Sequence, residues 1–143
     1  MASLLREWID KRDSAVRARL AVEAPPSLPA TVDPLIVRTV FDNLIDNALA
    51  YSPVGSRVQV QLASNEDAAP RQLRLQVRNE PGAAGAPDPD KVFSKYYRAA
   101  GAQARSGAGL GLFLVRSLAQ LCGGEVTHRR DGQQIVFEAT MPC

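Results

Sequence analysis

Two asparagines, Asn43 and Asn47, stand four residues apart in an apolar run with helical spacing. Residues at this separation share one face of an α-helix, so both carboxamides would point the same way. A carboxamide oxygen is a neutral ligand for a hard cation such as Mg²⁺, and the amide hydrogens can reach a phosphate oxygen. Neutral ligands leave the charge of the cation available to a polyphosphate. Two asparagines that merely face solvent are the simpler alternative, so the pair needs support from other residues.

A glycine-rich segment, Gly107 to Gly111 (GAGLG), stands directly before a second helical pattern. Glycines lack a Cβ atom and allow close approach, while the free amides and the dipole of a helix N-terminus favour an anion. The segment could therefore hold a phosphate chain. Close packing of the helix against a sheet explains such glycines equally well.

A third group of residues, Phe93 to Arg98 (FSKYYR), combines aromatic and cationic side chains within a long irregular segment. Such a loop could act as a mobile lid over a nucleotide. The alternative is a small hydrophobic cluster that anchors the loop.

The elements that would position these groups follow from hydrophobic periodicity. Helical spacing occurs in Leu4 to Arg19, Pro34 to Tyr51 and Leu112 to Cys122, weak helical character in Asp90 to Ala99, and extended or alternating patterns in Ala18 to Glu23, Arg57 to Ala63, Gln72 to Arg78, Glu125 to Arg130 and Gln134 to Thr140. This order predicts an α+β fold, a two-layer sandwich with helices on one face of a mixed, mainly antiparallel sheet. Residues 79–108 are the predicted flexible lid.

Composition and charge restrict the classes of protein to consider. The 143 residues carry a net charge of +2, which suits one globular domain and gives no surplus of charge that would favour nucleic acid. No apolar run is long enough to span a membrane, and we expect a cytoplasmic protein. Cys122, Cys143 and the single histidine, His128, lack metal-ligand spacing. His128 is expected to face water from a strand.

Taken in chain order, four segments resemble the N, G1, F and G2 boxes of the ATP-binding domain of bacterial sensor histidine kinases. They are Asn43 to Pro53, Asn79 to Gly82, Val92 to Arg98 and Gly107 to Leu112. These kinases share an ATPase class, GHKL, with gyrase, Hsp90 and MutL. The resemblance covers about residues 32–142 and implies the Bergerat ATP-binding fold, with ATP held between the long helix and the lid.

The resemblance also implies roles for individual residues. Asn47 would bind Mg²⁺ and Asn43 would lie near the phosphates, and both are the expected catalytic residues. Tyr51 would lie along the adenine. Asn79 stands where the family has an aspartate, and its oxygen can still accept a hydrogen bond from the adenine amine. The other expected ATP-binding residues are Lys95, Arg98, Arg105, Gly107, Gly109, Leu110 and Gly111.

Asn43 also separates the reaction classes within this resemblance. Hydrolytic relatives have a glutamate there that activates water, whereas asparagine is a poor general base. Transfer of the γ-phosphoryl group to a histidine on a separate dimerisation and phosphoacceptor domain of the same parent kinase is therefore favoured. His128 lies in the wrong element to be that acceptor. A serine kinase of the anti-sigma type is disfavoured because Asn43 replaces the expected acid.

These expectations describe one part of a larger protein. Residues 1–20 are predicted to be a linker or the end of the dimerisation helix, and residues 21–143 the catalytic domain. The fragment is expected to be monomeric. The parent kinase is expected to be a homodimer that acts on a response regulator. An anchor in the inner membrane is one alternative for the location of the parent. Pro81 replaces the first glycine of the G1 box, and Ala50 replaces a basic residue. These departures leave open a degenerate, non-catalytic module that docks a partner kinase or response regulator.

Overall fold

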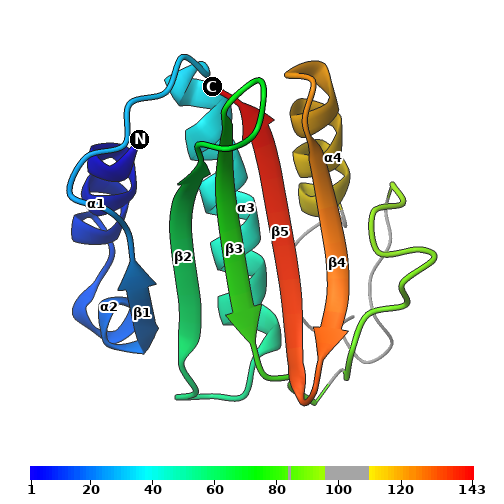
Figure 1. The fold of residues 1–143 in the computed structure, drawn as a ribbon. Coiled ribbons are helices and arrows are strands. Elements are labelled where there is room, and N and C mark those ends of the chain that lie inside the picture. The colour runs from blue at the N-terminus through cyan, green and yellow to red at the C-terminus, as the bar shows by residue number, and fades with distance from the viewer. Residues whose placement is uncertain (84, 96–109) are drawn as a thin grey trace.

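The computed structural model of the protein describes residues 1–83, 85–95 and 110–143. Its helices are α1 (Ala2–Asp10), α2 (Ser14–Arg19), α3 (Pro34–Tyr51) and α4 (Gly111–Leu121), and its strands are β1 (Leu20–Glu23), β2 (Val58–Asn65), β3 (Gln72–Asn79), β4 (Glu125–Asp131) and β5 (Gln134–Pro142). The strands form one sheet in the order β1-β2-β3-β5-β4 (Figure 1). Only the β1–β2 pair is parallel among the strands described, so the sheet is mixed and mainly antiparallel.

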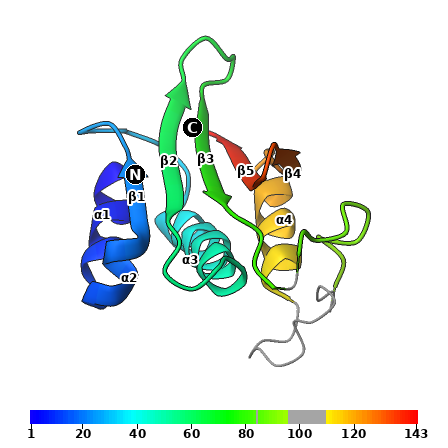
Figure 2. The same ribbon diagram turned by 90° about the horizontal axis from the view of Figure 1, so that it is seen from below.

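All the helices lie on one face of this sheet (Figure 2). The helix α3 lies in the middle of that layer and contacts α1 on one side and α4 on the other. Apolar side chains from the helices and from the inner face of the sheet form one core. The predicted two-layer α+β fold is therefore confirmed.

The long helix α3 begins and ends where the sequence predicts. The side chain of Asp33 caps it by accepting a hydrogen bond from the backbone N of Leu35 at 2.8 Å, and Pro34 occupies the first turn. Its apolar stripe is buried, with Phe41 and Leu44 completely inaccessible to solvent. This helix holds Asn43 and Asn47 in a fixed relation to the sheet.

The N-terminal region differs from the single helix that the sequence predicts. It forms two helices, because Asp13 caps α2 through a 2.8 Å hydrogen bond from the backbone N of Val16 and so ends the preceding turn. The helix α1 buries Leu5 and Trp8 in the same core as α3. The assignment of residues 1–20 to a linker or a dimerisation helix stays a prediction.

At the turn from α4 into β4, the main chain at Gly124 lies unusually close to the main chain of β5. A Cβ atom built on Gly124 would lie 1.9 Å from the backbone oxygen of Thr140 in β5. Only glycine fits there, because real Cβ atoms do not approach a backbone oxygen so closely. The close contact fixes α4 to the sheet at the end opposite Gly111.

His128 does not face water as expected. It lies in β4 opposite Phe137 of β5, and the two ring centroids are 4.9 Å apart. Both ring nitrogens are buried, without a hydrogen-bond partner in the part of the chain that the structure describes. This burial lowers the pKa of His128 from its ordinary value of 6.5.

Acid is expected to destabilise the domain through His128. Because the folded state lowers the pKa, the unfolded chain binds the proton more readily, and stability is lost as the pH falls from about 6.5 towards the folded pKa. In His128→Leu, the decrease in Tm between about pH 7 and about pH 5 should be smaller than in the wild type. Thermal unfolding followed by circular dichroism measures the difference. Equal pH dependence of the two proteins would mean that folding leaves the pKa of His128 unchanged.

Candidate functional site

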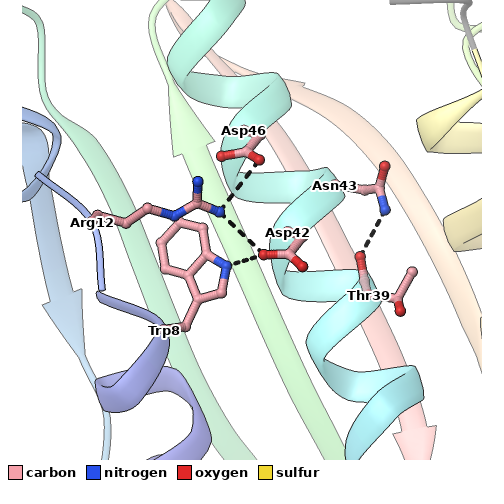
Figure 3. Close-up of polar contacts among 6 residues, drawn as sticks. All are labelled: Trp8, Arg12, Thr39, Asp42, Asn43 and Asp46. Atoms are coloured by element: carbon pink, nitrogen blue, oxygen red, sulfur yellow. Dashed lines mark hydrogen bonds and ion pairs between the residues drawn. The ribbon is translucent and has the colours of Figure 1, made fainter. Parts of the chain in front are cut away.

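Asn43 and Asn47 lie on one face of α3, as their spacing predicts, and both side chains are half-buried. The Nδ2 atom of Asn43 donates to the backbone oxygen of Thr39 at 2.8 Å (Figure 3). This bond fixes the carboxamide, and its oxygen is left to accept another group. The carboxamide of Asn47 makes no hydrogen bond within the described ranges, so both its oxygen and its nitrogen are available to a ligand.

The start of α4 lies against Asn43. A Cβ atom built on Gly111 would be 2.7 Å from the Oδ1 atom of Asn43, so a side chain at position 111 would displace the carboxamide. The N-cap residue Leu110 provides no side-chain hydrogen bond to the helix. The free amides and the positive end of the α4 dipole therefore lie beside Asn43, where they can stabilise an anion. Gly107 and Gly109 lie outside the described residues.

The other end of the candidate site joins α3 to the segment after β3. The backbone N of Gly82 donates to the backbone oxygen of Tyr51 at 2.8 Å. A Cβ atom on Gly82 would lie 2.5 Å from the same oxygen. Asn79, which is 2% exposed, donates from Nδ2 to the backbone oxygen of Glu80 at 2.8 Å. Its Oδ1 atom is therefore the one oriented to accept a hydrogen bond.

The segment 90–95 forms turns and not the weakly helical structure expected from the sequence. Val92 is buried, and the ring of Phe93 meets that of Phe137 edge-on at 6.0 Å. These apolar contacts anchor the loop, which is the alternative that the sequence left open for this segment. The Nζ atom of Lys95 lies 5.9 Å from the ring centroid of Phe113 in α4.

Some predicted residues therefore come together and others have no described position. Asn43 contacts Gly111, next to Leu110, and Tyr51 lies at the segment that follows Asn79. Arg98 and Arg105, like the expected helical residues 96–99, lie outside the described residues.

Sequence reasoning missed a group of residues on the opposite side of α3. Trp8 and Arg12, at the end of α1 and just beyond it, contact Asp42 and Asp46, the residues directly before the two asparagines (Figure 3). Burial is the main cause that raises the pKa of Asp46, and the nearby charge of Arg12 opposes this effect. Asp42 and Asp46 are four residues apart and so share one face of α3, but no local pattern pairs them with Trp8 and Arg12, which are 30 or more residues away in the chain.

Residues 32–143 match the family model described as histidine kinase-, DNA gyrase B-, and HSP90-like ATPase. The chain belongs to this ATPase family. The match covers the long helix α3, the glycine-rich start of α4 and all strands except β1, so the resemblance seen in the motifs is confirmed.

Within this ATPase family, the similar proteins include sensor proteins and sensor histidine kinases. The chain is 30% identical to the swarming motility regulation sensor protein RssA of Serratia marcescens, over 86% of this chain and 26% of the relative. It is 35% identical to the sensor histidine kinase WalK of Bacillus subtilis, over 74% of this chain and 18% of the relative. The chain thus spans about a quarter or less of the length of these relatives.

Solved structures of histidine kinases share the fold of this ATPase domain. The mycobacterial sensor histidine kinase MprB has a TM-score of 0.79 at 23% identity, and the match covers 99% of this chain and 95% of MprB. Full-length ShkA in complex with AMPPNP has a TM-score of 0.68 at 25% identity, with 99% of this chain and 30% of ShkA covered. The fold is that of a histidine kinase catalytic domain. Among residues 1–83, 85–95 and 110–143, no helix has the length and apolar character that a membrane crossing requires.

Proposed function

We propose that this ATPase domain binds Mg²⁺-ATP and transfers the γ-phosphoryl group to a histidine on a separate dimerisation and phosphoacceptor domain of its parent kinase. The observation that carries the proposal is the position of Asn43, held between Thr39 and the glycine start of α4. Asn47 follows one turn along the same helix, and its carboxamide makes no hydrogen bond to any residue that the structure describes. A helix N-terminus and two carboxamides on one helix face, one of them oriented by a hydrogen bond, are a suitable arrangement for a metal-bound phosphate chain.

The residues of the site fit a cation that arrives with its nucleotide. Asn47 supplies one neutral oxygen, and the described residues contain no group of three His, Cys, Asp or Glu side chains that could hold a free metal ion. We assign Asn47 as the residue that would hold Mg²⁺, together with phosphate oxygens of the nucleotide. When bound, Mg²⁺ neutralises charge that develops on the transferring phosphoryl group.

The nucleotide is proposed to lie along α3 with its base near the end of the helix. Asn79 would accept a hydrogen bond from the adenine amine through Oδ1, and Tyr51 would lie along the base. The main-chain hydrogen bond between Gly82 and Tyr51 supports this assignment, because it holds the two segments together. The phosphate contacts assigned to Asn43, Lys95, Arg98, Arg105, Gly107, Gly109, Leu110 and Gly111 are part of the same proposal.

Phosphoryl transfer is favoured over hydrolysis by the positions of the carboxylates on α3. Asp42 and Asp46, the acids nearest to the two asparagines in sequence, pair with Arg12 on the side of the helix that faces α1. Asn43 cannot act as a general base in their place, because an amide does not take up a proton near neutral pH. A histidine from another domain can attack without a general base. The lone pair on a neutral imidazole nitrogen is already available, so no proton has to be removed first.

We further propose that the parent kinase is a homodimer with a response regulator as its partner, and that residues 21–143 form the catalytic unit. This proposal rests on the sensor protein RssA and the sensor histidine kinase WalK among the relatives, of which this chain covers only a part.

Two measurements test the proposed function. Calorimetric titration with ATP should show binding that depends on Mg²⁺, and absence of binding at millimolar ATP would contradict the nucleotide site. The chain should then be mixed with the separately produced acceptor domain of its own parent and labelled ATP. Acid-labile phosphohistidine is expected on the acceptor domain. Nucleotide binding without any phosphohistidine would favour the non-catalytic docking module.

Gly111→Ala is expected to weaken ATP binding about tenfold, which corresponds to about 1.4 kcal/mol. The added methyl group would displace the Oδ1 atom of Asn43, which lies 2.7 Å from the position of that methyl group. Alanine is also a better helix former than glycine, so the free energy of unfolding should stay constant or rise. Calorimetry and urea unfolding measure the two quantities. The exposed Ser117→Ala, further along α4, is the control for affinity and should leave the Kd for ATP at the wild-type value.

A further inference from the structure

Four residues join α1 to α3, and we name them the α1–α3 clamp: Trp8, Arg12, Asp42 and Asp46. The indole Nε1 of Trp8 donates a hydrogen bond to Oδ1 of Asp42. The Nη2 atom of Arg12 lies 3.1 Å from Oδ1 of Asp42 and 3.4 Å from Oδ2 of Asp46. The guanidinium also lies over the indole, 4.0 Å from the ring centroid (Figure 3).

The geometry of the α1–α3 clamp is more restrictive than that of a single surface ion pair. Exposed pairs contribute little to stability, and the side chains of Arg12 and Asp42 are 31% and 39% exposed. Here, however, one planar guanidinium stacks on a buried indole and contacts carboxylates on two successive turns of α3. Such a set of contacts restricts both sliding of α3 along its axis and rotation about it.

The α1–α3 clamp is directly adjacent in sequence to the proposed nucleotide ligands. Asp42 precedes Asn43 and Asp46 precedes Asn47, and successive residues on a helix are separated by about 100° around its axis. The carboxylates therefore face α1, while Asn43 faces α4. Its Oδ1 atom occupies the space that a Cβ atom at position 111 would need. A rotation of α3 that loosens the α1–α3 clamp also moves Asn43 and Asn47 relative to the start of α4.

We propose that Arg12 and Trp8 are positioning residues, which hold α3 so that Asn43 and Asn47 are presented to the nucleotide beside α4. They act through Asp42 and Asp46 and do not touch the nucleotide themselves. The proposal rests on the proposed function for the effect on affinity, but the effect on the asparagines can be observed without any ligand.

The first test is the affinity of Arg12→Gln for Mg²⁺-ATP, measured by calorimetry well below the unfolding temperature. We expect the Kd to rise about five- to tenfold, within the usual range for residues that act on a site through a neighbour. Arg6→Gln is the matched control. Arg6 is on α1, six residues before Arg12, and donates at 3.0 Å to the backbone oxygens of both Pro25 and Pro26, and it makes no hydrogen bond or ion pair with α3 within the described residues. Its Kd should stay that of the wild type.

The second test uses signals that a loss of stability alone would not move. The side-chain amide resonances of Asn43 and Asn47, measured by NMR without nucleotide, should shift in Arg12→Gln and stay in place in Arg6→Gln. Trp8 is the only tryptophan of the chain. Its fluorescence should therefore respond to Mg²⁺-ATP, because coupling between two sites acts in both directions. This response should be lost in Arg12→Gln.

A double-mutant cycle separates positioning from general destabilisation. If Arg12 acts through its ion pairs, its replacement should change the Kd less in an Asp46→Asn background than in the wild type. If Arg12→Gln fails to fold, the Kd and the asparagine resonances of Asp46→Asn are compared with those of the wild type instead. A lowered Tm with unchanged Kd and unchanged asparagine resonances would overturn the proposal and leave a purely structural clamp. If the wild type binds no Mg²⁺-ATP, the proposed function fails, and the resonances still decide whether the α1–α3 clamp positions the asparagines.

Discussion

Asn47→Asp is expected to weaken Mg²⁺-dependent ATP binding about a hundredfold or more, which corresponds to about 2.7 kcal/mol. Asparagine and aspartate have nearly the same shape, so the replacement changes mainly the charge. A carboxylate at this position would repel the phosphate chain and consume part of the charge of Mg²⁺ that the neutral ligand leaves available. The free energy of unfolding should change little, since the carboxamide of Asn47 makes no hydrogen bond within the described ranges and is only half-buried.

The matched control for this variant is Asn65→Asp, at the end of β2. Asn65 is exposed, and its Oδ1 atom accepts a 3.2 Å hydrogen bond from the backbone N of Asp67, which an aspartate can also accept. It makes the same change of charge away from the proposed site. Calorimetric titration should give a wild-type Kd for Asn65→Asp. Equal affinities of Asn47→Asp and the wild type would remove Asn47 from the site.

Gly124→Ala is expected to lower the free energy of unfolding by about 3 kcal/mol, near the upper end for an overpacked site. The new methyl group would meet the backbone oxygen of Thr140 at 1.9 Å, and a backbone atom of a paired strand cannot move aside as a flexible side chain can. Either α4 must shift away from the sheet or the β4–β5 pairing must open. Urea unfolding followed by circular dichroism measures the loss.

Gly132→Ala is the comparison that separates close packing from backbone strain. Gly132 has φ +59° and no atom within 4 Å of its built Cβ, so alanine there meets strain but no obstruction. The expected cost is about 1 kcal/mol, typical of one residue forced into the left-handed region. If Gly124→Ala cost no more than Gly132→Ala, the close approach of α4 to β5 would be contradicted.

The parts of the fold that local chemistry determines could be predicted from the sequence. The limits of α3 follow from Asp33, Pro34 and an uninterrupted apolar stripe, and the spacing of Asn43 and Asn47 fixes their common face. The strand alternation gives the elements but not their order in space. The parallel pairing of β1 with β2 joins segments far apart in the chain, and no local pattern contains that information.

The features that sequence reasoning missed depend on tertiary contacts. Trp8 and Arg12 become neighbours of Asp42 and Asp46 only when α1 packs on α3, across thirty or more residues of chain. The burial of His128 arises from Phe137 on the neighbouring strand. The break before α2 is a different case, since Asp13 is a local capping signal that helical periodicity alone ignores.

The hydrogen bond from Gly82 to Tyr51 uses main-chain atoms on both sides. In evolutionary terms, we expect glycine to be kept at position 82, where a Cβ atom has no room, while the hydrogen bond requires no particular side chain at position 51. The side chains of Asn79 and Pro81 take no part in this hydrogen bond, so the segment can keep its position against α3 with these two residues in it.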